Sequence, residues 1–246
     1  MKVETASVLV IGNEILSGRT QDTNTNTIAK SLTEKGIKLV EARVIADDID
    51  TIIRHIRELE RVSDIIFTTG GIGPTHDDKT AEAMARAHNA SLELNQQAYD
   101  TLVTHYGSED AINEGRRKMA MIPVGATLID NPVSAAPGFH IGQCYVMAGV
   151  PKIMAAMLDN ILPTISGGDI VHSQTIQCDT AESILAPILA TLQGDYSNTD
   201  IGSYPQYVEG GFRVSVVIRD QDESRLKECA DHCLEMLDKA GISHKF

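Results

Sequence analysis

Residues 68–80 bring together three glycines, a histidine and two adjacent aspartates in one short segment. The residues before it, 64–67, predict a short buried strand, and 81–87 predict a helix. Glycines let backbone N–H groups approach an anion closely, and a helix N-terminus adds partial positive charge. Because Asp77 and Asp78 would repel a bare phosphate, they indicate a bound divalent metal or a proton-transfer role. The segment therefore predicts a site for a metal-bridged phosphate or pyrophosphate.

A plain structural interpretation competes with this one, since Asp77 or Asp78 can cap the following helix. Neither a cap nor a turn requires three glycines, a histidine and two aspartates together, so we favour the functional interpretation. His76 fits either a ligand or metal contact or a solvated loop histidine, and the sequence leaves both open.

Two other segments follow predicted strands. Residues 12–18 (GNEILSG) follow a buried strand at 6–12, and Asp47 and Asp48 follow a second strand at 37–46. Taken alone, the first fits a simple turn and the second a helix cap. In an open parallel sheet, ligands bind outside the carboxyl ends of the strands. We therefore expect all three segments to lie on one rim of the sheet.

The elements that must position this rim alternate between strand and helix, which predicts a doubly wound α/β domain with a mostly parallel sheet. Residues 95–121 look helical, and 130–139 form a predicted loop. The remaining predicted elements of this domain are helices at 22–36, 49–59 and 151–162 and strands near 127–129 and at 144–149.

A composition shift at 163–168 marks a boundary between a domain at 1–165 and a second domain at 170–246. The second domain has a β-α-β-β-α pattern, typical of a small α+β domain, with a predicted turn at Gly210 and Gly211. Its expected elements are strand 170–178, helix 181–193, strands 199–205 and 211–219, and helix 222–240.

Composition limits the possible partners. The formal net charge of −13 and the pI of about 5.0 argue against nonspecific binding to nucleic acid or to a membrane surface. No apolar run approaches the roughly 20 residues of a membrane span, and the N-terminus lacks a signal-peptide pattern. The four cysteines show no CxxC spacing, and Cys229 and Cys233 share a helix face, which favours core packing. We expect a reducing, cytoplasmic location.

Several of these motifs together resemble the N-terminal part of the CinA family of competence/damage-inducible proteins. Residues 1 to about 165 are similar to its molybdopterin-binding-like domain, which is shared with the molybdopterin adenylyltransferases (MoaB and MogA) and the gephyrin G domain. Residues 170–246 are similar to its small middle domain, often called KH-like. The motifs that carry the resemblance are residues 12–18, 22–24, 69–78, 131–133, 136–139 and 149–151.

The resemblance implies chemistry at a pyrophosphate. Relatives of CinA hydrolyse ADP-ribose or FAD with a divalent metal, whereas molybdopterin adenylyltransferases attach AMP to the terminal phosphate of the pterin. We therefore expect a metal-dependent, ADP-ribose pyrophosphatase-like hydrolase of nucleoside-diphosphate-linked compounds. The alternatives are an adenylyltransferase-like protein of molybdenum cofactor biosynthesis and a non-catalytic pterin- or nucleotide-binding protein. The chain does not include the C-terminal nicotinamide-mononucleotide deamidase domain of CinA proper, so that activity is not implied.

Roles follow for individual residues. Asp78 and Asp48 are expected to hold the metal (Mg²⁺, Mn²⁺ or Co²⁺), with Asp77 assisting, and these three are the expected catalytic residues. Molybdopterin is the alternative ligand. The expected substrate and phosphate contacts are Gly12, Asn13, Glu14, Asn24, Thr69, Gly70, Gly71, Gly73, Pro74, Thr75, His76 and Thr80.

The expected partners are a small nucleotide or pterin and further copies of the chain. Relatives form dimers or trimers, so the resemblance implies a homo-oligomer. Neither nucleic acid nor a membrane is an expected partner, because the chain is acidic. The small domain also lacks a GXXG loop of the kind that clamps a nucleic-acid backbone.

Overall fold

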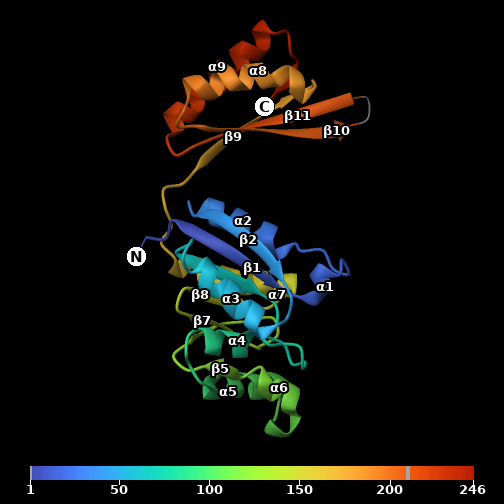
Figure 1. Ribbon diagram of the computed structural model, residues 1–246, viewed down its shortest axis with the longest axis vertical. Helices are drawn as coiled ribbons and strands as arrows, with labels where there is room; N and C mark the ends of the chain where they lie inside the picture. The colour runs from blue at the N-terminus through green and yellow to red at the C-terminus, as the bar shows by residue number, and fades with distance from the viewer. Residues whose placement is uncertain (1, 209–210) are drawn as a thin grey trace. The chain divides into compact units, whose positions relative to one another are not determined.

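The computed structural model describes residues 2–208 and 211–246. The chain divides between Gly168 and Asp169 into two compact units (Figure 1). The first unit buries two apolar clusters, one on each face of its main sheet, and the second unit buries a cluster of its own. Each unit therefore has the core that an independent domain needs.

The main sheet of the first unit has six strands in the order β2-β1-β3-β8-β7-β6. The first four are mutually parallel, and β7 and β6 continue the sheet in antiparallel pairing. β3 is buried along its whole length, as expected of a strand covered on both faces. The predicted α/β class with a mostly parallel sheet is confirmed. The strands are β1 (Thr5–Ile11), β2 (Lys38–Ile45), β3 (Ile65–Thr69), β6 (Thr127–Ile129), β7 (Gly138–Ile141) and β8 (Cys144–Met147).

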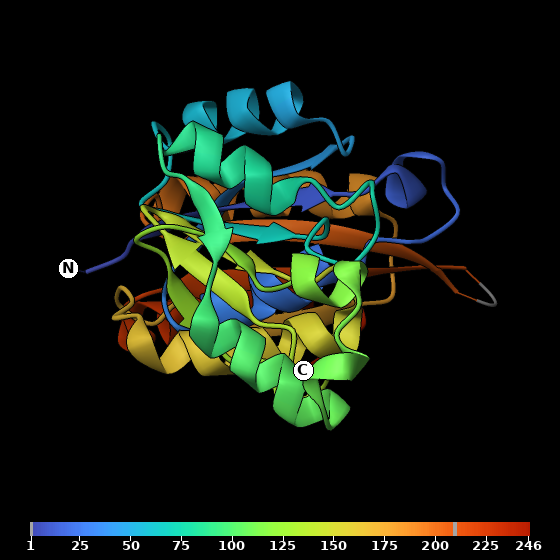
Figure 2. The same cartoon turned by 90° about the horizontal axis from the view of Figure 1, so that it is seen from below.

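Helices cover both faces of this sheet. On one face α2 (Asn24–Glu34) and α7 (Pro151–Ile161) bury their apolar stripes in one cluster. On the other face α3 (Ile49–Leu59) and α4 (Thr80–Ala87) do the same. Figure 2 shows α3 and α4, in cyan and green, on one side of the strands. This two-sided cover is why the central strands β1 and β3 are buried along almost their whole length.

The segment after α4 differs from the sequence prediction of one helical stretch at 95–121. It contains β4 (Leu92–Leu94), α5 (Gln96–Tyr106), a 3-10 turn at 109–111, α6 (Glu114–Lys118) and β5 (Met121–Pro123). β4 and β5 form a separate two-stranded sheet. Gly107 ends α5 in the left-handed region at φ +92°, and Asn113 caps α6 through its side chain. A glycine and a cap thus break the helix.

Two further departures are local. The predicted loop at 130–139 gives way to β7, which starts at Gly138 and pairs with β6 and β8. A short helix, α1 (Asn13–Leu16), forms inside the segment expected to be a turn.

The second unit is a four-stranded antiparallel sheet in the order β10-β11-β9-β12, with two helices. The β-α-β-β-α pattern is confirmed, and β12 is an addition that the sequence did not predict. Gly210, in the predicted turn, lies outside the described residues. The elements are β9 (His172–Cys178), α8 (Glu182–Asp195), β10 (Asp200–Val208), β11 (Gly211–Asp220), α9 (Glu223–Lys239) and β12 (His244–Lys245).

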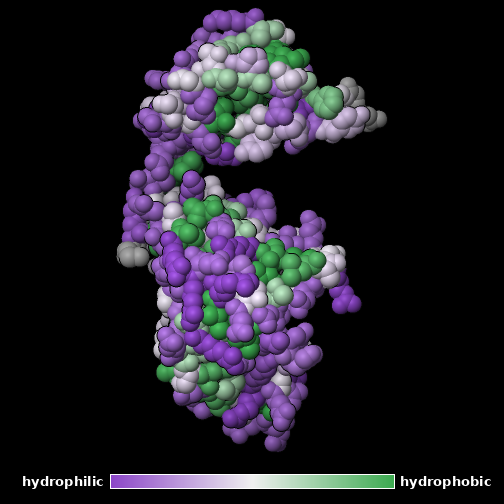
Figure 3. Space-filling view, viewed as in Figure 1, coloured by the Kyte–Doolittle hydropathy of each residue, from purple (hydrophilic) through white to green (hydrophobic). Residues whose placement is uncertain are grey.

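The surface carries mainly hydrophilic residues. The face shown in Figure 3 is mostly hydrophilic, with smaller hydrophobic areas. No helix among residues 2–208 and 211–246 is long and apolar enough to cross a membrane. All four cysteines are buried and unpaired, with no disulfide among them.

Candidate functional site

A cleft of about 520 Å³ opens at the carboxyl ends of β1, β3 and β8. Because these strands are parallel, the loops that follow them meet at one edge of the sheet. The loop after β2 reaches the same cleft through Asp47. The lining residues that carry polar groups or form the turn are Glu14, Thr20, Asp47, Gly70, Gly71, Gly73, Thr75, Asp77, Asp78, Asn131, Ser134 and Gly149.

The turn after β3 depends on two glycines with positive φ. Gly70 has φ +102°, and a Cβ there would lie 2.1 Å from the carbonyl oxygen of Ile11. Gly71 has φ +68°, and a Cβ there would lie 2.1 Å from Thr80 Oγ1. Only glycine can occupy both positions without displacing its neighbours. The chain can thus turn sharply from β3 into the cleft.

The N–H groups of this turn are not all free to bind a ligand. Gly70 N–H donates to the carbonyl of Met147 at 3.1 Å, and Thr75 N–H donates to Asp78 Oδ2 at 2.8 Å. In the part of the chain that the structure describes, the N–H groups of Gly71 and Gly73 have no acceptor. Of the three glycines predicted to cradle phosphate, Gly71 and Gly73 therefore retain donors, while Gly70 shapes the turn.

Asp77 and Asp78 share a partner in Thr75. The hydroxyl of Thr75 lies 2.5 Å from Asp77 Oδ1 and 2.5 Å from Asp78 Oδ2. Hydrogen bonding by Thr75 is the main cause that lowers the pKa of Asp77. Both carboxylates line the cleft. A lowered pKa keeps Asp77 ionised, which suits a group that holds a cation or accepts a hydrogen bond from water.

Asp47 faces these carboxylates across the cleft. Its Oδ2 accepts a hydrogen bond from Asn13 N–H at 2.8 Å. Burial is the main cause that raises the pKa of Asp47, and the negative charges of Glu14, Asp77 and Asp78 raise it further. Negative charge from three loops is therefore concentrated here.

The donor set fits a hard divalent ion that the substrate helps to hold. Among the described residues, the cleft carboxylates do not converge into a three-ligand cage. Mg²⁺-like ions usually take one or two carboxylates and complete their shell with water and substrate phosphates. Carboxylates on either side of a cleft meet that requirement.

Asp48 occupies a different position from the one that the sequence suggested. Its Oδ1 accepts the N–H of Thr51 at 2.9 Å, which makes it the N-cap of α3. That hydrogen bond is the main cause that lowers the pKa of Asp48. Asp48 is not among the residues that line the cleft, whereas Asp47 is. Of the two neighbouring aspartates, Asp47 is thus the one placed to contact a ligand in the cleft.

Asn24 and Thr69 lie beside the cleft in a small cavity of about 40 Å³ that Glu14 also lines. Asn24 Nδ2 donates to the carbonyl of Gly149 at 2.8 Å, while Asn24 Oδ1 and Thr69 Oγ1 are buried without a partner in the described chain. A cavity of this size, with unpaired polar atoms in its wall, is large enough for a water molecule. Asp22 caps α2 through the N–H groups of Asn24 and Thr25, which fixes Asn24 at this position.

The other predicted contacts separate into two groups. In the first group, Thr80 is fully buried and its hydroxyl hydrogen-bonds to the glycine turn. Gly12 N–H donates to the carbonyl of Ile45, which ends β2, and Asn13 N–H donates to Asp47 in the loop that follows. The side chain of His76 is 97% exposed and lies 3.9 Å from Asp77 Oδ1. His76 faces a second cavity of about 190 Å³, on the other side of the turn, which Lys79 and Lys118 also line.

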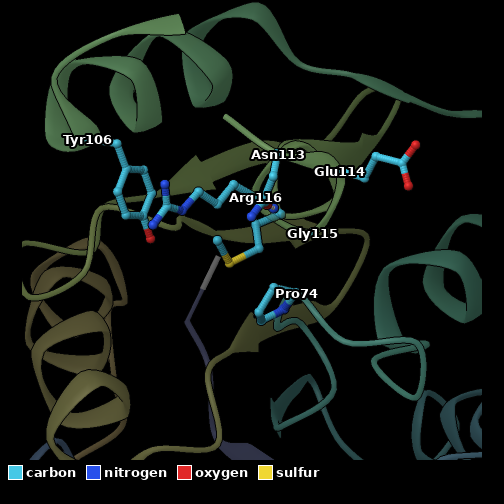
Figure 4. A pocket seen from close by; sticks show the side chains of 7 residues that line it. Pro74, Tyr106, Asn113, Glu114, Gly115 and Arg116 are labelled. Atoms are coloured by element: carbon cyan, nitrogen blue, oxygen red, sulfur yellow. Dashed lines mark hydrogen bonds between the residues drawn. The ribbon is translucent and has the colours of Figure 1, made fainter. Parts of the chain in front are cut away.

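A third cavity, of about 530 Å³, adjoins the cleft at Pro74. Figure 4 shows Pro74 across from Gly115, and the side chain of Arg116 extending toward the ring of Tyr106. The guanidinium carbon of Arg116 lies 3.7 Å from the centre of that ring. This is a cation–π contact, which fixes the arginine side chain at the rim.

Sequence reasoning gave no role to several residues of the site. Lys118 Nζ donates to the carbonyl of Thr75 and brings a positive charge to the carboxylate turn. Asn131 is buried, and its amide group bonds to Ser134 and to the carbonyl of Ala136, which shapes the loop that closes the cleft. The Asn-Pro pair at 131–132 was the available sign of an ordered turn.

Comparison with known proteins agrees with this architecture. Residues 7–167 match the family described as "Probable molybdopterin binding domain", and residues 170–245 match "FAD synthase, middle domain". A protein of Archaeoglobus fulgidus is 33% identical over 230 residues, which cover 94% of this chain and 96% of that protein. A protein of Pyrococcus abyssi is 34% identical over 254 residues, which cover 98% of each.

A solved structure extends the comparison. The crystal structure of CinA from Thermoplasma acidophilum, described as a protein of unknown function, is 37% identical and covers 66% of this chain and 98% of that one, with a TM-score of 0.63. The resemblance to the CinA N-terminal region is confirmed. Since the family match spans residues 7–167, the chain belongs to the molybdopterin-binding domain family, in its CinA-like form.

Proposed function

We propose that this protein is a metal-dependent hydrolase that cleaves the pyrophosphate bond of nucleoside-diphosphate-linked compounds such as ADP-ribose or FAD. One observation carries the proposal. Three carboxylates and two backbone N–H groups without an acceptor line the same cleft, and they belong to Asp47, Asp77, Asp78, Gly71 and Gly73. The cleft volume of about 520 Å³ lies within the roughly 300–1,000 Å³ of small-molecule sites.

The residues have distinct tasks in this proposal. Asp78 and Asp47 would hold the divalent ion, taking the roles that the sequence assigned to Asp78 and Asp48. Such an ion neutralises phosphate charge and acidifies a bound water. Gly71 and Gly73 donate N–H groups to non-bridging phosphate oxygens. A carboxylate oxygen of Asp77 accepts a hydrogen bond from the attacking water and orients it toward phosphorus.

The match of residues 170–245 to the middle domain of FAD synthase supports a flavin dinucleotide as one substrate to test. The family description also favours a second candidate, which is adenylyl transfer to the phosphate of molybdopterin. Both reactions need a nucleotide, a metal and carboxylates near a pyrophosphate. A third outcome is ligand binding without turnover.

One assay series separates these functions. The purified full-length protein is incubated with Mg²⁺, Mn²⁺ or Co²⁺, first with ADP-ribose or FAD and then with ATP plus molybdopterin, and nucleotide products are measured by chromatography. AMP released from ADP-ribose or FAD supports hydrolysis. AMP transferred to the pterin supports the second candidate, and tight binding without product supports a non-catalytic role.

Asp78→Asn is the decisive variant. It should lower metal-dependent turnover at least ~100-fold, as the loss of one electrostatic contact to a transition state often does. The amide oxygen of asparagine can still accept the hydrogen bond from Thr75 N–H, so the fold should persist. Asp159→Asn, on the exposed side of α7, is the matched control. Unchanged turnover in folded Asp78→Asn protein would remove Asp78 from the mechanism.

We also propose that the protein assembles as a homo-oligomer, a dimer or a trimer, in the cytoplasm, and that it does not bind nucleic acid or membranes. Light scattering of the full chain at micromolar concentration tests the assembly, and a monomer would refute it. Sub-micromolar binding of RNA at physiological salt would refute the exclusion of nucleic acid.

A further inference from the structure

Three metal-binding side chains from distant parts of the chain meet at the edge of the main sheet opposite the cleft. They are Glu60, His88 and Cys144, and one donor atom of each lies within 4.8 Å of the other two. Among the described residues, no other three carboxylate, imidazole or thiol groups meet so closely. The trio therefore stands apart from the scattered acidic groups of the surface.

The imidazole of His88 lacks ordinary hydrogen bonds. Its Nδ1 lies 3.8 Å from Glu60 Oε1, which exceeds hydrogen-bond length, and its Nε2 is buried without a partner in the described chain. Buried polar atoms in folded proteins nearly always have a partner. Because Nδ1 makes no hydrogen bond among the described residues and lies beside the Glu60 carboxylate, its lone pair is available to a cation that the two groups would share.

The spacing suits a shared metal ion. With metal–nitrogen and metal–oxygen bonds of about 2.0–2.1 Å and a tetrahedral arrangement, two ligand atoms lie roughly 3.3–3.4 Å apart. The 3.8 Å between His88 Nδ1 and Glu60 Oε1 is close to that separation. All donor atoms of the trio lie within 4.8 Å of one another, so shifts of about 1 Å would bring them to metal-ligand spacing.

The local electrostatics also favour a cation. Glu60 and His88 are the residues that end α3 and α4. Helix C-termini carry partial negative charge, which stabilises a positive ion nearby.

We propose that Glu60, His88 and Cys144 form a binding site for a borderline divalent transition-metal ion, with Zn²⁺ favoured by the sulfur, nitrogen and oxygen donors. Binding forms one metal–sulfur bond and releases the thiol proton to solvent. A water molecule takes the fourth position, on the side where the Glu60 carboxylate is 29% exposed. The ion ties the ends of α3 and α4 to the first residue of β8.

This site is distinct from the cleft. Cys144 begins β8, whereas Gly149, beyond the other end of the strand, lines the cleft. Five residues of extended chain separate them by about 16 Å. The two sites also differ in chemistry, because the cleft offers oxygen ligands and this one offers sulfur and nitrogen.

Cobalt spectroscopy of the full-length, metal-free protein tests the proposal. Co²⁺ bound to a thiolate gives a strong near-ultraviolet charge-transfer band, and tetrahedral Co²⁺ gives strong visible bands, while oxygen ligands alone give neither. One equivalent of Co²⁺ should produce both sets of bands, and Zn²⁺ should abolish them. Zn²⁺ should also raise the melting temperature of the wild-type protein, as any ligand of the native state does.

Matched variants assign the bands. Cys144→Ala should lose the charge-transfer band, whereas Cys229→Ala, at another buried cysteine, and Asp78→Asn, in the cleft, should keep it. Should Cys144→Ala fail to fold, Glu60→Gln and His88→Gln should each weaken Co²⁺ binding at least ~10-fold, since ligand loss costs no less than loss of a supporting residue. No charge-transfer band in wild-type protein at millimolar Co²⁺, or a band that persists in Cys144→Ala, would overturn the site.

Discussion

The hydroxyl of Thr80 donates a hydrogen bond of 2.9 Å to the carbonyl of Gly70, and both residues are buried. The N–H of Thr80 also donates to the carbonyl of Gly71, at 3.0 Å. The first residue of α4 thus closes the turn that follows β3. Thr80 holds the shape of the glycine turn from behind and does not itself line the cleft.

Thr80→Val should therefore destabilise the protein while keeping its shape. Valine fills the same volume but leaves the buried Gly70 carbonyl without its donor, at a cost of about 1–3 kcal/mol. Thr80→Ser, which retains the hydroxyl, should cost less. Urea unfolding monitors both variants. Equal stability of the valine and serine variants would show that the hydrogen bond has no such role.

Gly70→Ala should destabilise the protein more than Gly107→Ala does. Both glycines have positive φ, but only at Gly70 would the added Cβ meet another atom. Gly107 is the matched control, since it has φ +92° and no atom within 4 Å of a Cβ. Gly107→Ala should cost about 1 kcal/mol from φ alone. Gly70→Ala should cost at least ~2 kcal/mol more, because its Cβ meets a backbone oxygen that cannot move away cheaply. If Gly70→Ala and Gly107→Ala lower the free energy of unfolding equally, the carbonyl of Ile11 moves away from the new Cβ at no cost.

Asp47→Asn should change the metal dependence of turnover, whereas Asp48→Asn should not. Asparagine caps a helix about as well as aspartate, so Asp48→Asn should change stability by less than ~0.5 kcal/mol and leave turnover unchanged. Asp47→Asn removes one charge from the cleft and should raise the Mn²⁺ concentration for half-maximal turnover about 10-fold or more. The reverse result would return the metal-holding role to Asp48.

Asp220 should make the second unit sensitive to acid. Its side chain is 1% exposed and accepts hydrogen bonds from Arg225, from Thr199 and from the N–H of Asp222. The hydrogen bond from Arg225 is the main cause that holds the pKa of Asp220 far below its usual range. A carboxylate with a depressed folded-state pKa stabilises the fold above the unfolded-state value, near 3.9, and loses that contribution as pH falls below it.

Asp220→Asn should thus lower stability by about 1–3 kcal/mol at pH 7 and flatten its decline between about pH 5 and pH 2. Hydrogen exchange of β11 amides measures the second unit directly. Asp231→Asn, exposed on α9, is the control and should keep the wild-type pH profile. If Asp220→Asn protein loses stability in acid as steeply as wild type, other carboxylates cause the acid sensitivity.

Elements with a strong local pattern were predictable from the sequence. β1 and β3 are rich in apolar residues and almost wholly buried because helices cover both faces of the sheet. α7 begins at Pro151, as its proline predicted. β7 was not predictable, because Gly138–Ile141 is short, starts with glycine and becomes a strand only by pairing between β6 and β8. Tertiary pairing, not local propensity, decides such a segment.

The candidate site was likewise only partly predictable from the sequence. The composition of residues 68–80 pointed to the cleft, because the loops after β1, β2, β3 and β8 follow the carboxyl ends of parallel strands and meet there. The loop at 131–136, which follows the antiparallel strand β6, also lines the cleft and was not predicted to do so. Which of two adjacent aspartates faces the cleft depends on the path of the backbone between β2 and α3, and neither composition nor spacing contains that information. The buried position of Thr80 depends likewise on the φ angles of Gly70 and Gly71.

The hydrogen bond from Gly70 N–H to the carbonyl of Met147 has a consequence for synthesis on the ribosome. The first half of the unit, β1 to β3 with α2 and α3, can begin to pair as it leaves the exit tunnel, because the partners of β1 in the sheet, β2 and β3, are both complete by Thr69. The turn after β3 has to wait until β8, nearly eighty residues later, arrives beside it. A nascent chain stalled before Cys144 would therefore carry the residues of the turn without the strand that anchors it, and competence for ligand would appear late in translation.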